Sequence, residues 1–316
     1  MAANAGFAMS AKAVYLVSRL LLAPLVLSYI SLVEYGLWSA TFVLIMYIGL
    51  SDAGFSNVYV RFVARHHAQG DIPAISRLLS TGIFTMLPMA VLIWLVLWLA
   101  IPHVLDFLKV DDAHRGTAAV LTLGAGAMYL VDLSFGAFCY CLQGLQRIRE
   151  EQKVAMLANL LELAFLVVFL QAGFGVLSLL AAFVLRYCWS LSSYVRLAYR
   201  FVPGLQIRLR HYDRSMLRHF FGFGSAVQAS ALIGTALFSI DRVIAGFLLG
   251  PKGIALFELG GKLPVSANTI PSAISSVTLP TAARHSAGQD ESALTTLHRQ
   301  ASRAVSMVAA VPLAFM

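Results

Sequence analysis

Charged residues are scarce in this chain, and the signatures of soluble enzymes are missing. Only 12% of the 316 residues are charged, about half the share typical of soluble globular domains. The sequence has no P-loop, no G-x-G-x-x-G and no G-x-S-x-G pattern, and its eight histidines do not form an H-E-x-x-H spacing. We therefore expect no catalytic residues, no metal site and no cofactor.

Cysteine is also rare, with three residues that all fall in apolar stretches. Cys139 and Cys141 are two positions apart, so they point to different faces of a helix. A disulfide or metal framework needs paired spacings at accessible places. We interpret Cys139, Cys141 and Cys188 as small core residues.

Long hydrophobic runs dominate what is present, since 59% of the residues are hydrophobic. A run of about 20 apolar residues matches the roughly 30 Å hydrocarbon core of a bilayer. Eight such stretches occur, at 13–33, 37–60, 80–101, 117–142, 154–173, 174–195, 223–249 and 253–282. A ninth starts at Ala301. The first is too long for a signal peptide and contains Arg19, so we predict that it is retained. The chain is predicted to be an all-α polytopic membrane protein without a soluble domain.

The basic residues favour one orientation of these spans. Because helical spans leave loops on alternating sides, the Lys and Arg residues can be assigned to a side. With the N-terminus inside, three are outer (Lys109, Arg115 and Lys252) and four lie within spans. The inner set has sixteen members: Lys12, Arg61, Arg65, Arg77, Arg147, Arg149, Lys153, Arg196, Arg200, Arg208, Arg210, Arg214, Arg218, Arg284, Arg299 and Arg303. This asymmetry follows the positive-inside rule, so the net charge of +8 does not indicate nucleic-acid binding.

The longest inner segment divides the chain into two lobes. We predict an N-terminal six-helix lobe over 1–200, a basic linker over 201–222 that ends in an amphipathic interfacial helix, and the start of a second lobe over 223–316. A weak internal similarity at a shift of 219 residues, which places Trp38 on Phe257 and Arg65 on Arg284, fits a repeat of six spans. A complete second lobe would need five or six spans, so we expect this lobe to be truncated.

Ionisable groups inside the spans are the candidate functional residues, because each costs about 2.5–3.5 kcal/mol to insert. They are Arg19, Asp52, Asp132, Glu162, Arg186, Asp241, Arg242, Glu258 and Lys262. Counted from the predicted outer turn at Glu34–Gly36, Arg19 and Asp52 lie at equal depth and are predicted to pair. Counted from the turn at Gly250–Gly253, Arg242 and Lys262 also share a depth. Asp241 could pair with Lys262 across that hairpin, and Glu258 with Lys262 along one helix.

Two interpretations of these groups stay open. They could be structural ion pairs between neighbouring helices, or they could line a transport cavity. Cations there (Arg19, Arg242, Lys262) would suit an anionic cargo such as a diphosphate. The acids Asp52, Asp132 and Asp241 are candidate cavity or coupling groups, and Asp132 has no basic neighbour on its own helix. The prolines at 264, 271 and 280 predict a bent eighth span.

Several motifs resemble a known family. The run Glu34-Tyr35-Gly36-Leu37-Trp38, the run 49–55 (GLSDAGF) and the Arg61/Arg65 end with Gly70-Asp71 resemble the first hairpin of oligosaccharide (O-antigen-type) flippases and polysaccharide exporters. The run 241–250 (DRVIAGFLLG) resembles the start of that family's second lobe. These proteins belong to the multidrug, oligosaccharidyl-lipid and polysaccharide exporter superfamily. The resemblance implies 12 to 14 spans in two lobes around a cavity, of which this chain has about nine.

The resemblance implies that the chain is a flippase of the bacterial inner membrane, with a cytoplasmic N-terminus, that moves a polyprenyl-diphosphate-linked oligosaccharide. By resemblance to the lipid II flippase branch, Arg19, Arg242 and Lys262 are candidates for contacting the diphosphate. Its partners would be the lipid-linked oligosaccharide and the bilayer, with other polysaccharide-assembly membrane proteins as further candidates. One alternative is an ion-coupled multidrug antiporter, which predicts an acid-dominated, aromatic-lined cavity. Another is a membrane glycosyltransferase or polymerase, but the loop 102–116 is too short for its catalytic site.

Overall fold

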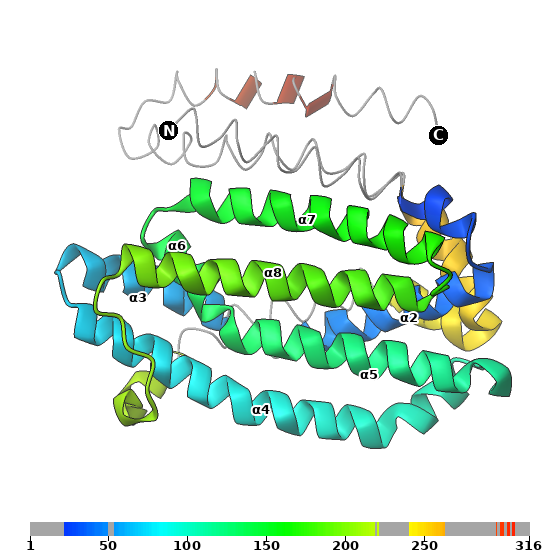
Figure 1. Ribbon diagram of the computed structural model, residues 1–316, viewed down its shortest axis with the longest axis horizontal. Coiled ribbons are helices and arrows are strands. Elements are labelled where there is room, and N and C mark those ends of the chain that lie inside the picture. Colours follow the sequence, from blue (N-terminus) through cyan, green and yellow to red (C-terminus); the bar gives the residue numbers. More distant parts are fainter. Residues whose placement is uncertain are drawn as a thin grey trace.

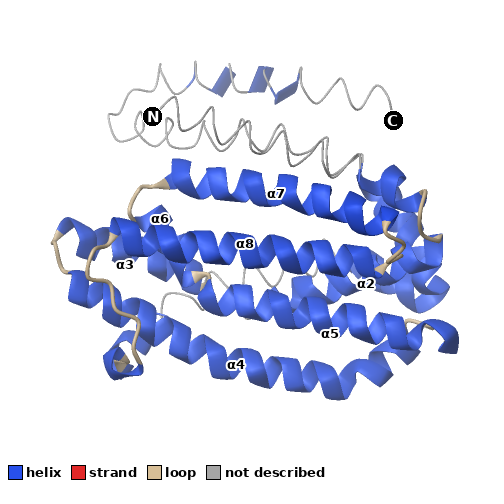
Figure 2. Cartoon of the chain, viewed as in Figure 1, coloured by secondary structure: helices blue, strands red, loops and turns tan. Residues whose placement is uncertain are grey.

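The computed structural model describes residues 22–49, 54–218, 220 and 240–262, together with 295, 298, 299, 302, 303, 305 and 306. The regular structure in these parts is entirely helical (Figure 2). The bounded elements are α2 (Leu32–Gly49), α3 (Phe55–Ala68), α4 (Ile72–Phe107), α5 (Asp112–Phe135), α6 (Ala137–Gly144), α7 (Ile148–Gln171), α8 (Leu177–Phe201) and the short 3-10 helix η2 (Leu209–His211). Figure 1 shows α4, α5, α7 and α8 side by side along the long axis.

The start of α2 corrects the predicted outer turn. Ser31 and Glu34 form a reciprocal capping box: the Glu34 Oε2 accepts hydrogen bonds from the backbone N–H and hydroxyl of Ser31, each at 2.8 Å, and the Ser31 Oγ accepts the N–H of Glu34 at 3.2 Å. The helix therefore begins at Leu32, and the predicted turn at Glu34–Gly36 is wrong because these residues form its first turns.

Helix α4 is longer than its apolar stretch. Its 36 residues span about 54 Å at 1.5 Å per residue, so the helix continues beyond the predicted 80–101 at both ends. Asp71 caps the N-terminus, since its Oδ1 accepts the N–H of Ala74 at 2.9 Å. Pro88 and Pro102 lie inside the helix without ending it.

Small residues bring several helices into close contact, as is usual between helices in membranes. A Cβ on Gly82 of α4 would lie 1.7 Å from the Tyr59 hydroxyl of α3, and one on Gly144 of α6 would lie 2.9 Å from the Val60 carbonyl. Buried hydrogen bonds add to this packing. The hydroxyls of Thr41 in α2 and Thr122 in α5 are 3.1 Å apart.

Residues 240–262 are helical and fold back on themselves at Gly250. Gly250 has a φ of 68°, a conformation that glycine adopts without strain. The Nε of Arg242 lies 3.1 Å from the Oε2 of Glu258, whereas 16 residues of straight helix would separate these positions by about 24 Å. The predicted turn at Gly250–Gly253 is therefore confirmed, and we call residues 240–262 the hairpin.

Two core clusters mark opposite ends of the bundle. One contains Tyr35, Leu108, Val110, Val176 and Ile254, so the first turns of α2 meet the other predicted outer loops at one end. There a Cβ on Gly36 would lie 2.0 Å from the Pro251 carbonyl oxygen. The other cluster is formed by Val63, Leu145, Ala198, Val202 and Leu205, among others. At this end the Arg147 guanidinium lies 4.6 Å from the Phe201 ring centroid. The loops thus alternate between the ends as predicted.

The sides of the bundle are apolar and exposed. Along α4, the exposed fraction reaches 61% at Leu92, 57% at Val96 and 65% at Leu99, which is favourable in hydrocarbon and costly in water. Five described helical segments have the length and apolar composition of a membrane span, and four of them, 32–49, 72–107, 112–144 and 148–171, do not fold back on themselves; the fifth is 240–262. The last of these is the hairpin, whose two arms run antiparallel.

Two further sequence predictions change. Cys141 is buried and Cys139 half-buried, as core residues are, but Cys188 is exposed, so its assignment to the core is wrong. The predicted interfacial helix begins at Arg214, and its Phe220 is fully buried. The Phe220 ring stacks on Phe55 of α3 at 4.4 Å between centroids, so protein rather than lipid covers this part of the apolar face.

Candidate functional site

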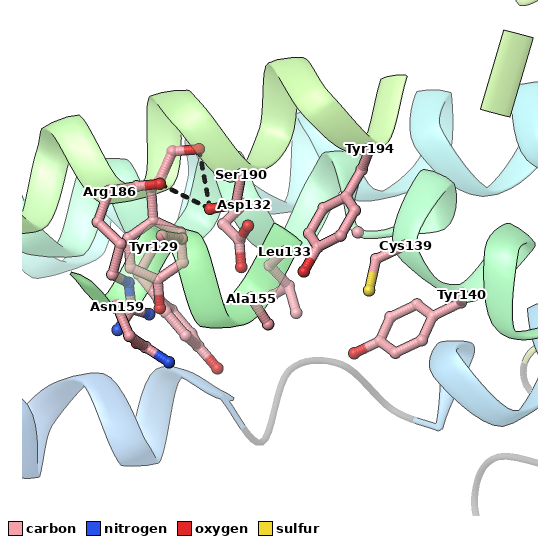
Figure 3. Close-up of a pocket in the computed structure, with 13 residues that line it drawn as sticks. Tyr129, Asp132, Leu133, Cys139, Tyr140, Ala155, Asn159, Arg186, Ser190 and Tyr194 are labelled. Carbon is pink, nitrogen blue, oxygen red and sulfur yellow. Dashed lines mark hydrogen bonds between the residues drawn. The ribbon is translucent and has the colours of Figure 1, made fainter. Parts of the chain in front are cut away.

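A cavity of about 360 Å³ opens among α5, α6, α7 and α8 (Figure 3). Each helix contributes side chains at helical spacing, such as Tyr129 and Asp132 from α5, or Arg186 and Ser190 from α8. Its size is at the lower end of the range for small-molecule sites, about 300–1,000 Å³. It brings ionisable and aromatic side chains together inside the apolar bundle.

An ion pair between α7 and α8 lies beside the cavity, which Arg186 lines. The Nη1 of Arg186 donates to the Oε2 of Glu162 at 3.2 Å, and both side chains are largely shielded. Glu162 lies 11 residues before Gly173, and Arg186 lies 11 residues after Gly175. The short turn between these helices therefore places the two groups at equal depth.

The Arg186 side chain is held by more than its carboxylate partner. Its guanidinium lies 4.4 Å from the ring centroid of Tyr187 and 5.8 Å from that of Phe183, both within cation–π range. In Figure 3 the Ser190 hydroxyl donates to the Arg186 carbonyl, at 2.7 Å, and also approaches the Tyr187 carbonyl. The Glu162 carboxylate and the two rings orient the guanidinium beside the cavity, whereas the Ser190 hydroxyl bonds only to the backbone of α8.

Asp132 faces the same cavity from α5, next to Tyr129 and Gly136. Its carboxylate interacts electrostatically with Arg186 across the helix interface. The prediction that Asp132 has no basic partner on its own helix is consistent with this geometry, because its cationic neighbour comes from α8. Asp132, Glu162 and Arg186 form a cluster of two acids and one base, which we call the charged cluster.

The rest of the lining combines rings with polar groups. Four tyrosines (Tyr129, Tyr140, Tyr187 and Tyr194) border the cavity, and Asn159 and Ser190 add an amide and a hydroxyl. Tyrosine offers an apolar face and one hydrogen-bonding group. Such a wall can contact a polar, hydroxyl-rich molecule through the faces of the tyrosine rings and through the tyrosine hydroxyls. Among the residues that the structure describes, no group of three His, Cys, Asp or Glu is arranged to hold a metal ion.

The predicted cations of the second lobe lie on the hairpin, apart from this cavity. Arg242 pairs with Glu258, and its Nη1 approaches the sulfur of Met46 in α2 at 3.8 Å. Arg242 also borders a second cavity, about 350 Å³ and almost wholly apolar, between α2, α4 and the hairpin. A cation therefore stands at the edge of an apolar space.

Lys262 has different partners from those predicted. Its Nζ donates to the Tyr35 hydroxyl at 2.7 Å and lies 5.4 Å from the ring centroid. The predicted Glu258–Lys262 pair does not form, because Glu258 pairs with Arg242 across the hairpin. The predicted Asp241–Lys262 pair is also not seen, and Asp241 is exposed. Arg19 and Asp52, and hence their predicted pair, lie outside the described residues.

Glu162 and Arg186 are among the ionisable groups predicted within spans, but neither is among the predicted cavity cations or coupling acids. The signal was present: counting from the turn at 173–175 gives both the same depth, as the same count did for Arg242 and Lys262. The cavity itself had no sequence signal, because its tyrosines are spread over three helices whose packing fixes which faces meet.

Comparison with protein families gives one match. The model of a family described as "Polysaccharide biosynthesis protein" matches residues 2–286. No curated protein matches the chain.

Solved structures with the same fold are membrane transporters. An inward-facing multidrug resistance MATE family transporter of the MOP superfamily aligns with a TM-score of 0.64 at 19% identity, over 93% of this chain and 72% of that one. An outward-facing transporter of the same description gives 0.55 at 20% identity, over 99% and 69%. A MOP superfamily transporter from Pyrococcus furiosus, whose binding pocket is described as having reverse polarity, gives 0.52 at 20% identity, over 96% and 68%. The chain therefore has the fold of these transporters.

Proposed function

Because this chain belongs to the polysaccharide biosynthesis protein family and has the MOP transporter fold, we propose that it translocates a polyprenyl-diphosphate-linked oligosaccharide across the bacterial inner membrane. It is a multi-pass membrane protein of a transporter family, and the proposal involves no covalent chemistry. The observation that carries the proposal is the family match over residues 2–286. A transporter in polysaccharide synthesis needs a cargo that begins on one side of the bilayer and is used on the other.

The sugar portion would pass through the polar cavity. Oligosaccharides are rich in hydroxyls, and transferring an unpaired hydroxyl to an apolar environment costs several kcal/mol, about 2–7. The four tyrosines, Asn159 and Ser190 supply ring faces and hydrogen-bonding groups that reduce this cost. The lipid tail would stay in the bilayer.

The diphosphate would be held by cations of the hairpin. Arg242 is oriented by Glu258 at 3.1 Å and lies beside the apolar cavity between α2 and α4. A diphosphate could replace the carboxylate as the partner of this guanidinium, while the first isoprene units occupy the apolar space. Lys262, 2.7 Å from the Tyr35 hydroxyl, and Arg19 would be the other contacts.

The charged cluster is the proposed coupling site. Arg186 is paired with Glu162 and also attracts the nearby Asp132 carboxylate, so a proton or cation bound at Asp132 would remove that second attraction. When an ionised side chain changes its partner from one helix to another, the equilibrium between two conformations of a lobe can shift. Asp52 and Asp241 are further candidate acids.

A second function is favoured by the cavity itself. An ion-coupled multidrug antiporter predicts acids and aromatic rings around the cargo, and the cavity has Asp132, nearby Glu162 and four tyrosines. Two of the structural neighbours are described as multidrug transporters. Arg186 argues against cationic cargo, because it offsets one of the two acids.

The experiment that separates these functions replaces the cations one at a time. Cells whose own flippase is deleted would be complemented with Arg19→Ala or Arg242→Ala, with Lys252→Ala in the exposed outer turn as control. We expect both cavity-cation variants to lose surface polysaccharide and the control to retain it. Normal polysaccharide in both variants, with raised drug sensitivity after Asp132→Asn, would instead support the antiporter.

The orientation is also proposed. Arginines dominate the bundle end that holds Arg147, Arg200 and the linker, and the positive-inside rule places that end in the cytoplasm. The N-terminus would then be cytoplasmic as well. The lipid-linked oligosaccharide, and other membrane proteins of polysaccharide assembly, are the proposed partners.

A further inference from the structure

The backbone of the linker that follows α8 is hydrogen-bonded to side chains in the first turns of α4. Three hydroxyls of α4 take part: those of Ser76, Ser80 and Thr81. They accept hydrogen bonds from the backbone N–H groups of Gln206 at 3.1 Å, Arg208 at 3.2 Å and Asp213 at 2.9 Å. Side chains of the linker are not used in these contacts, so its path does not depend on its arginines.

The arginines of this segment are left exposed. Arg208, Arg210 and Arg214 are exposed, and in the part of the chain that the structure describes they form no ion pair. Asp213 is the only acid between 196 and 222. Its Oδ1 instead accepts two hydrogen bonds from Ser215, at 2.9 Å and 2.7 Å, and these lower the pKa of its carboxyl. We call Arg208, Arg210 and Arg214 the linker patch.

A leucine lies within the patch. Leu209 stands between Arg208 and Arg210 and is 67% exposed, although its neighbours Leu205 and Ile207 pack on the core. An exposed leucine flanked by two arginines is unfavourable in water. It is favourable where a polar layer meets hydrocarbon, because the leucine can enter the apolar side while the arginines stay in the polar layer.

The depth of the linker matches that layer. The apolar stretch 80–101 of α4 rises about 33 Å, close to the roughly 30 Å hydrocarbon core. Ser76 and Ser80, which hold the linker, therefore lie where this stretch begins. The far side of the linker is fixed too, since Phe220 stacks on Phe55. The linker patch is thus held at the level of the lipid headgroups.

We propose that the linker patch is a docking surface for anionic phospholipid headgroups of the leaflet on this side, with Leu209 inserted among their acyl chains. Arginine binds phosphate through two parallel hydrogen bonds, and each basic side chain near an anionic leaflet strengthens binding about fivefold. The patch lies along α4, which contributes no residue to the polar cavity, and this favours bilayer lipid over the transported cargo as its ligand.

The test measures lipid binding to the purified protein in mild detergent, by native mass spectrometry. Phosphatidylglycerol is titrated against phosphatidylcholine. For R208Q/R210Q/R214Q we expect phosphatidylglycerol binding to weaken on the order of 10²-fold and phosphatidylcholine binding to stay unchanged. R208K/R210K/R214K should retain most of the affinity. The matched control R65Q/R196Q/R200Q removes three exposed arginines elsewhere on the same end of the bundle and should bind phosphatidylglycerol as the native protein does.

Three results would overturn the proposal. Equal losses in the linker variant and its control would mean that only net charge matters. Unchanged phosphatidylglycerol binding in the linker variant would exclude the patch as a lipid site. A parallel titration measures the binding of a soluble polyprenyl diphosphate analogue. If the linker variant loses affinity for this analogue and not for phosphatidylglycerol, the patch binds the cargo. Thermal melting of each variant checks that it is folded, and the lysine variant gives a folded comparison if the glutamine variant is not.

Discussion

Removing Arg186 should destabilise the protein far more than removing Glu162. The Arg186 and Glu162 atoms are 3.2 Å apart, which corresponds to about 5 kcal/mol of Coulomb attraction at an effective dielectric constant near 20. Desolvation offsets much of this gain, but deleting one partner of a buried pair typically costs about 3–5 kcal/mol because the other charge is left uncompensated. Arg186→Met leaves two acids, Glu162 and Asp132, without their cation.

Glu162→Gln should be milder because the negative charge of Asp132 still lies close enough to attract Arg186. We expect Arg186→Met to lower the free energy of unfolding by about 3 kcal/mol and Glu162→Gln by about 1 kcal/mol. The double variant should be less destabilised than the sum of the two, by a coupling energy of about 2 kcal/mol. Arg196→Met, on an exposed face of the same helix, is the matched control and should change stability by less than about 0.5 kcal/mol.

The assay is reversible unfolding of the purified protein in mixed micelles with increasing SDS, followed by helix signal. A coupling energy near zero, or a larger effect of Glu162→Gln than of Arg186→Met, would refute the assignment of Arg186 as the shared partner of two acids. The same variants in a transport assay would separate stability from function, because the proposed coupling role predicts lost transport in any Asp132→Asn protein that still unfolds normally.

Two further predictions concern packing. Gly36→Ala should cost about 1–3 kcal/mol, because its Cβ would lie 2.0 Å from the Pro251 carbonyl and the hairpin must move; Gly116→Ala, which meets nothing within 4 Å, should be neutral or slightly stabilising. Unfolding curves of the two variants compare them directly, and equal stability would contradict the close contact at the outer turns. In detergent, a small thiol reagent should modify Cys188 well before the buried Cys141; mass spectrometry of peptides identifies the site, and preferential modification of Cys141 would contradict the packing of α6.

The class of fold and the course of the chain could be predicted because they depend on local signals. Spans of about 20 apolar residues and the asymmetry of arginines report on the bilayer directly. Span ends were less accurate. The predicted turn at 34–36 is wrong because Glu34 lies three residues after Ser31, which is a capping-box spacing and places Glu34 inside the helix.

The site was predictable only in part, because ion-pair partners depend on which helix faces meet. Counting from the turn predicts that Arg242 and Lys262 share a depth, but depth alone cannot choose a partner. Glu258, four residues before Lys262, faces the first arm of the hairpin and pairs with Arg242, which leaves Lys262 to Tyr35 from α2. Likewise, Arg186 of α8 pairs with Glu162 of α7 and also attracts Asp132 of α5. A single sequence gives the depth of each group but not the rotation of each helix, which decides which groups at one depth meet.

Flipping of a labelled lipid in reconstituted vesicles tests the central proposal most directly. The purified protein is inserted into liposomes that contain a fluorescent polyprenyl-diphosphate oligosaccharide, and an impermeant quencher reports how much of it has changed leaflet. We predict that the native protein speeds this movement over protein-free liposomes and that Arg242→Ala abolishes the gain. No acceleration by the native protein, in vesicles where it does exchange a cationic drug for protons, would contradict the proposal.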